Sequence, residues 1–395
     1  MSSELTAKDL AGEPKLIRHH HHHHHSHEEP NPGERKSEYR NSVQKLRLLL
    51  MFFLCIDLFG LPTIYGSFAQ AACRFAPLSF FILSGYFVLR DSENRSERIL
   101  RTIKRSAIVF AILVPVYLAV NFAYYTLNGM DFFAPFLSGQ AWLDFLLFNL
   151  WPFDIGNAIW YVQAYLYAYI ILYFLEKKDL LRYDWLIAGA CIVLAVLTGE
   201  LTGVLKFNVF GYEYFPGNFL TRALPYLLIG SLMRRKFKLL NRVPMQWYAV
   251  FCLIGTALVV AEIFALSIAD AVGYYGHLVG MGVLAVSACM IALKDDREAT
   301  KFEKKFRLSR RDTAVIYYCS QPVAYGLAIL LKISLPQYFD DLAGVIGLAT
   351  FVVCFVIMLP VAFIRRKHRT KKYLKAHNAR LEKEKAKAEG AQGPA

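Results

Sequence analysis

Charged residues are scarce in this chain of 395 residues: Asp, Glu, Lys and Arg together make up 19%, whereas soluble domains carry roughly a quarter. Disulfide and zinc-site spacings are absent too, because the seven cysteines all fall inside apolar runs, where a thiol behaves as a small hydrophobe. No Walker A or dinucleotide-binding loop is found. These absences exclude a soluble, a disulfide-rich secreted or a disordered protein.

Apolar residues, by contrast, account for 56% of the chain. They recur between Leu46 and Phe363 in runs of about 20, the length that a helix needs to cross a bilayer core. The sequence therefore predicts an all-α integral membrane protein with about ten transmembrane helices in one bundle. The predicted spans are 46–65, 68–90, 106–126, 159–176, 184–200, 218–233, 246–267, 273–293, 313–332 and 343–364.

Positive charge is distributed in bands rather than evenly. Most of the Lys and Arg between spans lie in every second connection, namely 91–105, 177–183, 234–245 and 294–312. Because basic loops stay in the cytoplasm, this pattern predicts that both termini are cytoplasmic. The same banding argues against a nucleic-acid partner, although the formal net charge is +14.

Two polar segments flank the predicted transmembrane domain, which covers residues 46–364. Residues 1–45 contain an unbroken run from His19 to His25, which is either an expression tag or a native low-complexity segment, and we expect this part to be disordered. Residues 365–395 form a basic tail suited to contact with anionic lipid. The aromatic stretch from Phe132 to Phe153 is predicted to be an interfacial or re-entrant segment on the outer face.

Ionisable residues inside predicted spans mark candidate sites, because each costs roughly 2.5–3.5 kcal/mol at the centre of a helix. Asp57 in the first span and Arg74 in the second both lie roughly 10–12 Å below the outer boundary at 1.5 Å per residue. We therefore expect them to form a buried ion pair in an outward-facing cavity. Glu262 and His277 lie near the outer ends of later spans, either as boundary residues or, for His277, as a general base.

On the predicted cytoplasmic side, Arg98, Arg101 and Arg105 are spaced so that they share one helix face. Such a face suits a phosphorylated ligand, since guanidinium groups bind phosphate in a bidentate manner. The alternative interpretation is that the cluster only sets the topology.

Six segments carry further patterns, in this order: RLLLMFFLCIDL, RFAPLSFFILSGYFVLR, RILRTIKRSAIVFAILVPVY, AIWYVQAYLYAYIILYFL, GNFLTRALPYLLIGSLMRR and AVIYYCSQPVAYGLAILL. Together they resemble helices of the membrane-bound acyltransferase 3 family. The resemblance covers about residues 40–365. It implies an acyl-CoA donor used from the cytoplasmic side and a hydroxyl or amine acceptor on the outer side of the membrane.

Both histidines that the family usually carries are missing. In the family, a basic residue in the first helix is followed, after ten intervening residues, by a histidine; counting from Arg47, that place is Leu58, beside Asp57. The late His-Pro pair of the family is here Gln321 and Pro322. Glutamine can orient a substrate but cannot take a proton at neutral pH.

Three possibilities follow from the missing histidines. Asp57 replaces the base, His277 supplies it from another helix, or catalysis is lost and the protein binds lipid or regulates a neighbour. A transporter of lipid-linked sugar is a further alternative, disfavoured because the sequence shows no convincing internal repeat.

For an enzyme, the resemblance implies transfer of an acyl group, such as acetyl, to a glycan or lipid of the cell envelope, in a bacterial inner membrane. Arg98, Arg101 and Arg105 are then expected to hold the phosphates of coenzyme A, and Arg47 and Arg74 to stabilise the thioester oxyanion. Asp57 is expected to deprotonate the acceptor. Trp160 and Gln163 are expected to line the outer mouth, and Ser84 to serve helix packing or bind substrate. No metal is expected, and the oligomeric state is open.

Overall fold

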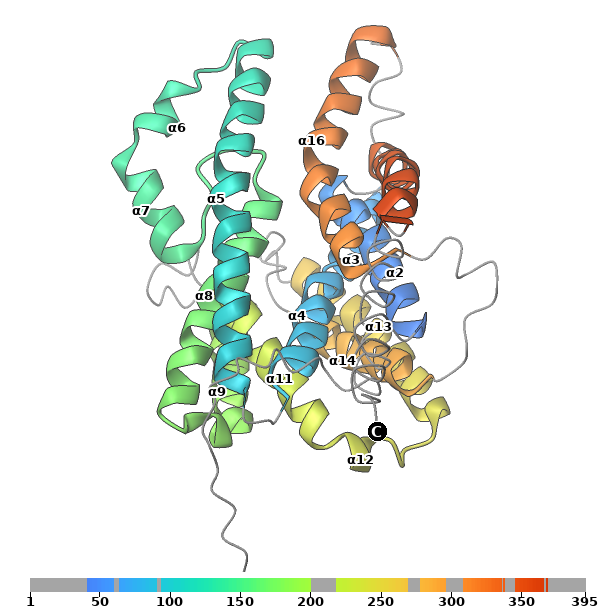
Figure 1. The fold of residues 1–395 in the computed structure, drawn as a ribbon. Coiled ribbons are helices and arrows are strands. Elements are labelled where there is room, and N and C mark those ends of the chain that lie inside the picture. Colours follow the sequence, from blue (N-terminus) through green and yellow to red (C-terminus); the bar gives the residue numbers. More distant parts are fainter. Residues whose placement is uncertain are drawn as a thin grey trace, which may run out of the picture. The chain divides into compact units, whose positions relative to one another are not determined.

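The computed structural model describes residues 41–59, 64–90, 94–199, 218–268, 278–295, 308–335, 337, 345–365, 367 and 368. Within these ranges the protein is helical and contains no strand. The helices are shown in Figure 1. In chain order they are α2 (Asn41–Phe59), α3 (Ile64–Cys73), α4 (Phe75–Val88), α5 (Arg95–Leu127), α6 (Phe133–Leu137), α7 (Gly139–Phe148), α8 (Asn157–Lys177), η1 (Leu180–Tyr183), α9 (Asp184–Thr198), η3 (Phe219–Ala223), α11 (Leu224–Arg235), α12 (Phe237–Leu240), α13 (Met245–Ile268), α14 (Val279–Lys294), α16 (Arg310–Ser334) and a last helix, Ile346–Arg365.

Among the described residues, seven helices are long and apolar enough to cross a membrane. They confirm a multi-pass, all-helical membrane protein. The other predicted spans coincide with α2, with η3 followed by α11, and with the short apolar helix α14. The count of ten crossings therefore stays a prediction.

The predicted span 68–90 is helical from Ala69 to Val88 but contains a one-residue turn. α3 ends at Cys73 and α4 begins at Phe75, with a turn at Arg74 between them. Pro77 explains the break, because it has no N–H to donate to the carbonyl of Cys73 four residues earlier. The turn places Arg74 at the head of α4.

The aromatic stretch between α5 and α8 folds as two short helices, α6 and α7, rather than as a crossing. Ser138 caps α7 by accepting a hydrogen bond from the backbone N–H of Ala141 at 3.2 Å. The indole N–H of Trp142 donates to the Phe136 carbonyl at 2.7 Å and so fixes the angle between the two helices.

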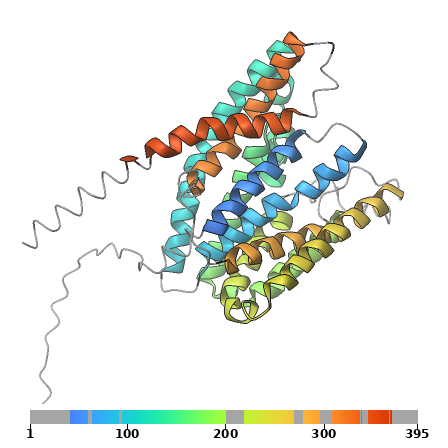
Figure 2. The same cartoon turned by 90° about the vertical axis from the view of Figure 1, so that its right-hand side faces the viewer.

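Glycine permits close helix crossings in two places. A Cβ atom on Gly85 of α4 would overlap the Leu227 carbonyl of α11, and one on Gly230 of α11 would overlap the Ile82 carbonyl of α4. The antiparallel pair α13 and α14, side by side in Figure 2, makes the same kind of contact between Gly255 and Gly280. Small residues let helix backbones meet in this way in membranes, where van der Waals packing drives association.

The basic ends of the helices are tied together at one end of the bundle. The contacts are Arg95 with Glu176 at 2.7 Å, Arg235 with Asp184, Lys294 Nζ with the Asn241 carbonyl at 2.9 Å, and Ser42 Oγ with Asp295 at 2.7 Å. Each joins helix ends that border the connections predicted to be cytoplasmic. The described parts of these connections therefore lie on one side.

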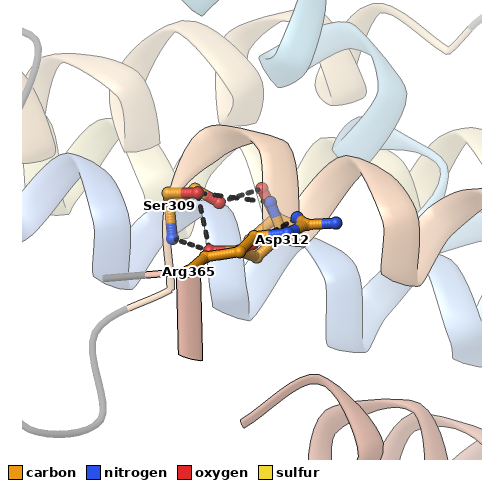
Figure 3. A network of polar contacts seen from close by, with 4 residues as sticks. Ser309, Asp312 and Arg365 are labelled. Carbon is orange, nitrogen blue, oxygen red and sulfur yellow. Dashed lines mark hydrogen bonds and ion pairs between the residues drawn. The ribbon is translucent and has the colours of Figure 1, made fainter. Parts of the chain in front are cut away.

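The start of α16 carries a further network of polar contacts (Figure 3). Ser309 and Asp312 form a capping box, in which each side chain binds the backbone N–H of the other residue. Asp312 is buried and also accepts a hydrogen bond from Arg365 at 2.9 Å. This ion pair attaches the last helix to the first turn of α16.

The glycine crossing between α4 and α11 is testable by substitution to alanine. Gly85→Ala should destabilise the protein by about 1–3 kcal/mol, because the added methyl group forces the two backbones apart. Gly189 on α9 is the matched control, since no atom lies within 4 Å of a Cβ placed there. Gly189→Ala should leave the thermal unfolding midpoint of the purified protein unchanged or raise it, because alanine favours helix. Equal midpoints for the two variants would contradict the backbone contact.

Candidate active site

Asp57 and Arg74 form the ion pair that the sequence predicts. Arg74 Nε lies 3.2 Å from Asp57 Oδ1, which joins the end of α2 to the start of α4. Gln70 of α3 donates to the backbone carbonyl of Asp57 at 2.5 Å. The two side chains are 31% and 20% exposed for Arg74 and Asp57, respectively, so the pair remains accessible to a ligand.

A second guanidinium group and a phenol complete this cluster. Arg222 interacts electrostatically with Asp57, and so does Tyr317 of α16. Arg222 lies in the π-helix η3, which Asn218 caps by accepting from the backbone N–H of Leu220 at 2.8 Å. Two arginines thus lie within electrostatic range of one carboxylate, and the resulting excess of positive charge suits an oxyanion.

A row of tyrosines leads away from the cluster along α8. Tyr161, Tyr165 and Tyr169 are four residues apart and share one face. The Tyr161 ring lies 5.3 Å from that of Tyr317 and stacks on Phe81 of α4 at 4.7 Å. The row therefore starts beside the charged cluster and continues between α4 and α8.

Ser84 of α4 lies at the other end of this row. Its hydroxyl is 2.6 Å from that of Tyr165 and 3.0 Å from that of Tyr169. Ser84 is buried, and the neighbouring Gly85 makes the backbone contact with α11. These contacts connect α4 with α8, so they account for Ser84 by helix packing.

Arg47 lies apart from the cluster. It is ten residues before Asp57 on α2, which corresponds to about 15 Å along the helix axis. Its guanidinium carbon is 5.8 Å from the centre of the Phe87 ring, near the end of α4, whereas Arg74 stands at the start of that helix. The structure therefore does not bring Arg47 and Arg74 to one carbonyl oxygen.

The residues predicted to line the outer mouth make contacts within the protein. Gln163 is fully buried and donates to the Phe145 carbonyl at 2.7 Å, which anchors α7 on α8. Trp160 packs under Arg222, whose guanidinium carbon is 5.6 Å from the indole ring. Gln321 is buried one turn beyond Tyr317 and donates to the Asp154 carbonyl at 3.4 Å. Trp160 thus directly contacts a member of the cluster.

The three arginines of the predicted phosphate clamp lie on one helix, α5, but differ in their contacts. Arg98 donates to the carbonyls of Val88 and Arg90 and so caps the C-terminal end of α4. Arg101 pairs with Glu97 at 3.2 Å on the exposed face, and Arg105 is exposed. Arg98 therefore has a structural role, while Arg101 and Arg105 face outward.

Glu262 is a helix cap rather than a boundary side chain. Its two carboxylate oxygens accept hydrogen bonds from the backbone N–H groups of Val279 and Gly280, each at 3.1 Å. A negative charge at the start of α14 also complements the helix dipole. His277 lies outside the described residues, and its role stays a prediction.

The charge pair is testable by exchange. Asp57→Arg and Arg74→Asp each place like charges together, a repulsion on the order of a few kcal/mol at this partly exposed position. The double exchange restores opposite charges and should recover yield and thermal stability relative to either single variant, measured on protein purified in detergent. A double variant no more stable than the worse single variant would show that the pair does not join α2 to α4.

Comparison with known proteins gives a match to one family, and the matched residues include the whole cluster. The sequence model of the acyltransferase 3 family, described as an acyltransferase domain, matches residues 43–365, which include all helices described above from the first turn of α2 to the end of the last helix. Neither the search of curated proteins nor that of solved structures gave a significant match. The family match spans most of the chain and agrees with the resemblance read from its helices. The protein therefore belongs to the acyltransferase 3 family of membrane proteins.

Proposed function

We propose that this family member transfers an acyl group from acyl-CoA to a hydroxyl group of a cell-envelope glycan or lipid. The observation that carries the proposal is the cluster around Asp57, in which a partly exposed carboxylate is held by Arg74 beside Arg222 and Tyr317. It combines a proton acceptor with two cations, the groups that acyl transfer to an alcohol requires.

In the proposed reaction, Asp57 accepts the proton of the acceptor hydroxyl as its oxygen attacks the thioester carbonyl. Arg74 and Arg222 stabilise the negative charge that develops on the carbonyl oxygen. The carbon–sulfur bond then breaks, the ester remains on the acceptor, and the thiolate of coenzyme A leaves and takes up a proton.

The surroundings of Asp57 favour this residue as the base in place of the missing histidines. Other carboxylates of the helices are bound to structural partners: Glu262 caps α14, Asp184 pairs with Arg235, and Asp312 caps α16. Asp57 is also paired, with Arg74, but its side chain is 20% exposed, and it interacts electrostatically with Arg222 and with Tyr317, whose ring contacts the tyrosine row. These features support a catalytic role over a purely structural one.

The topology proposed for this reaction has ten crossings and both termini in the cytoplasm of a bacterial inner membrane. The joining of the basic helix ends on one side supports it, because basic segments remain in the cytoplasm. The Asp57 cluster then lies toward the outer face, where the acceptor would be.

The alternative to an enzyme is a non-catalytic protein of the same fold. It would bind a lipid or regulate a neighbour, and it would retain the Asp57–Arg74 pair for stability alone. Comparative mass spectrometry of envelope glycans and lipids, with and without the gene, separates the two. A mass difference of one acyl group supports the enzyme and identifies its product, whereas identical envelopes support the alternative.

Asp57→Asn tests the proposed base directly. The amide keeps the shape of the side chain but cannot accept the proton, so acyl transfer from radiolabelled acetyl-CoA in proteoliposomes should fall by roughly 10²–10⁴-fold. Asp179→Asn is the matched control, because its side chain is 80% exposed and asparagine tolerates its left-handed backbone at φ 53°. The control should keep full activity. Activity of Asp57→Asn equal to that of the control would refute the role of Asp57.

The phosphates of coenzyme A are proposed to bind at Arg101 and Arg105, the outward-facing residues of the α5 cluster. The double variant Arg101→Ala/Arg105→Ala should raise the KM for acyl-CoA about tenfold or more, since charge-assisted hydrogen bonds contribute roughly 1.5–3 kcal/mol. The kcat should be unchanged. Arg182→Ala, with a side chain that is 63% exposed on η1, serves as the control and should not alter KM. A fall in kcat at unchanged KM would instead place these arginines outside the donor site.

A further inference from the structure

An apolar groove lies between α9, α11, α13 and α14, away from the ion pair of Asp57. Its volume is about 420 Å³, and its lining includes Ile192, Ile229, Phe251, Val283 and Val286. This size falls within the range of about 300–1,000 Å³ typical of ligand sites. The proposed acyl transfer does not use it.

Two hydroxyl groups of the lining are engaged within the protein. The Tyr248 hydroxyl donates to the Leu240 carbonyl at 2.8 Å, and the Ser287 hydroxyl donates to the Val283 carbonyl at 2.8 Å. The groove therefore offers a ligand mainly carbon surface. Such a site selects a hydrocarbon rather than a sugar or a nucleotide.

The groove borders the surface that faces lipid. Side chains on the free faces of its two outer helices are large, apolar and exposed: Val193 and Leu197 on α9 are 57% and 54% exposed, and Leu253 and Val260 on α13 are 72% and 53% exposed. α13, and α9 together with η1, are long and apolar enough to span a membrane. The bilayer is therefore the nearest source of an occupant.

The dimensions of the groove fit one acyl chain. Along α14 the lining extends from Val279 to Ser287, which corresponds to about 12 Å at 1.5 Å per residue. A methylene group takes up about the share of volume of a water molecule, roughly 30 Å³, so the groove holds on the order of 14 of them.

Positive charge lies at one end of the groove. Lys294 Nζ is 5.4 Å from the centre of the Tyr248 ring, and Arg242 in the turn before α13 is exposed. A phosphate group at this end would complete a lipid whose acyl chain extends along α14 toward Val279. We propose that the groove binds one acyl chain of a bilayer phospholipid, with its headgroup at the Lys294 end.

Photo-crosslinking in proteoliposomes tests this site. The vesicles contain phosphatidylethanolamine and a minor fraction of phosphatidylglycerol that carries a diazirine in one acyl chain, and labelled peptides are mapped by mass spectrometry. The expected result is labelling concentrated on the groove-facing residues of α9, α13 and α14. Labelling spread evenly over the exposed apolar faces would overturn the proposal, because it would show ordinary bilayer contact only.

Substitutions that fill the groove provide a second test of the same proposal. Val283→Trp should reduce labelling within the groove by about tenfold, the change that corresponds to lost contact with two methylene groups. Leu253→Trp adds the same side chain on the exposed face of α13 and should leave labelling unchanged. If gel filtration shows that the Val283→Trp variant does not fold, the Val286→Trp variant is used in its place.

Two results would contradict a lipid in the groove. One is equal labelling of Val283→Trp and Leu253→Trp. The other is the formation of crosslinks between two copies of the chain through α9 and α13 when a bifunctional reagent is used, together with loss of lipid labelling at the same residues. Neither result depends on acyl transfer, so the test is independent of the proposed activity.

Discussion

The backbone contact between α4 and α11 is the constraint on which the candidate site depends. Gly85 and Gly230 let the two helices meet without intervening side chains, and any Cβ at either position would overlap a carbonyl group of the other helix. Arg74 stands at the start of α4, and Arg222 lies in the π-helix that leads into α11. Because the crossing fixes these two helices relative to each other, it also constrains the positions of Arg74 and Arg222, the two arginines that interact electrostatically with Asp57.

Much of the fold and one part of the site could be predicted from the sequence. Runs of apolar residues located the helices, and the opposite charges of Asp57 and Arg74 at matched depth on neighbouring antiparallel spans predicted their pairing. Such predictions succeed because bilayer thickness ties position along a helix to depth. The break at Arg74 does not follow from apolar runs alone, although Pro77 is a signal for it.

The rest of the site depends on which helices are neighbours, and single spans do not encode this. Arg222 and Tyr317 reach Asp57 from elements far away in the chain. The spacing of Tyr161, Tyr165 and Tyr169 shows a shared face but not what it packs against. In the same way, Glu262 is recognisable as an acid near a helix end, whereas its role as the cap of α14 requires the pairing of α13 with α14.

The π-helix η3 has a consequence for how this segment can vary. A π-turn holds one residue more than an α-turn, and such turns are frequent at functional sites. Removing a single residue from Phe219–Ala223 would give an uninterrupted α-helix with better local geometry. It would also rotate Arg222 by about 100° about the helix axis relative to the glycine crossing, because each residue turns an α-helix by that angle. The length of this segment is therefore constrained as well as the identity of Arg222, and related chains should keep the same number of residues between Asn218 and Gly230.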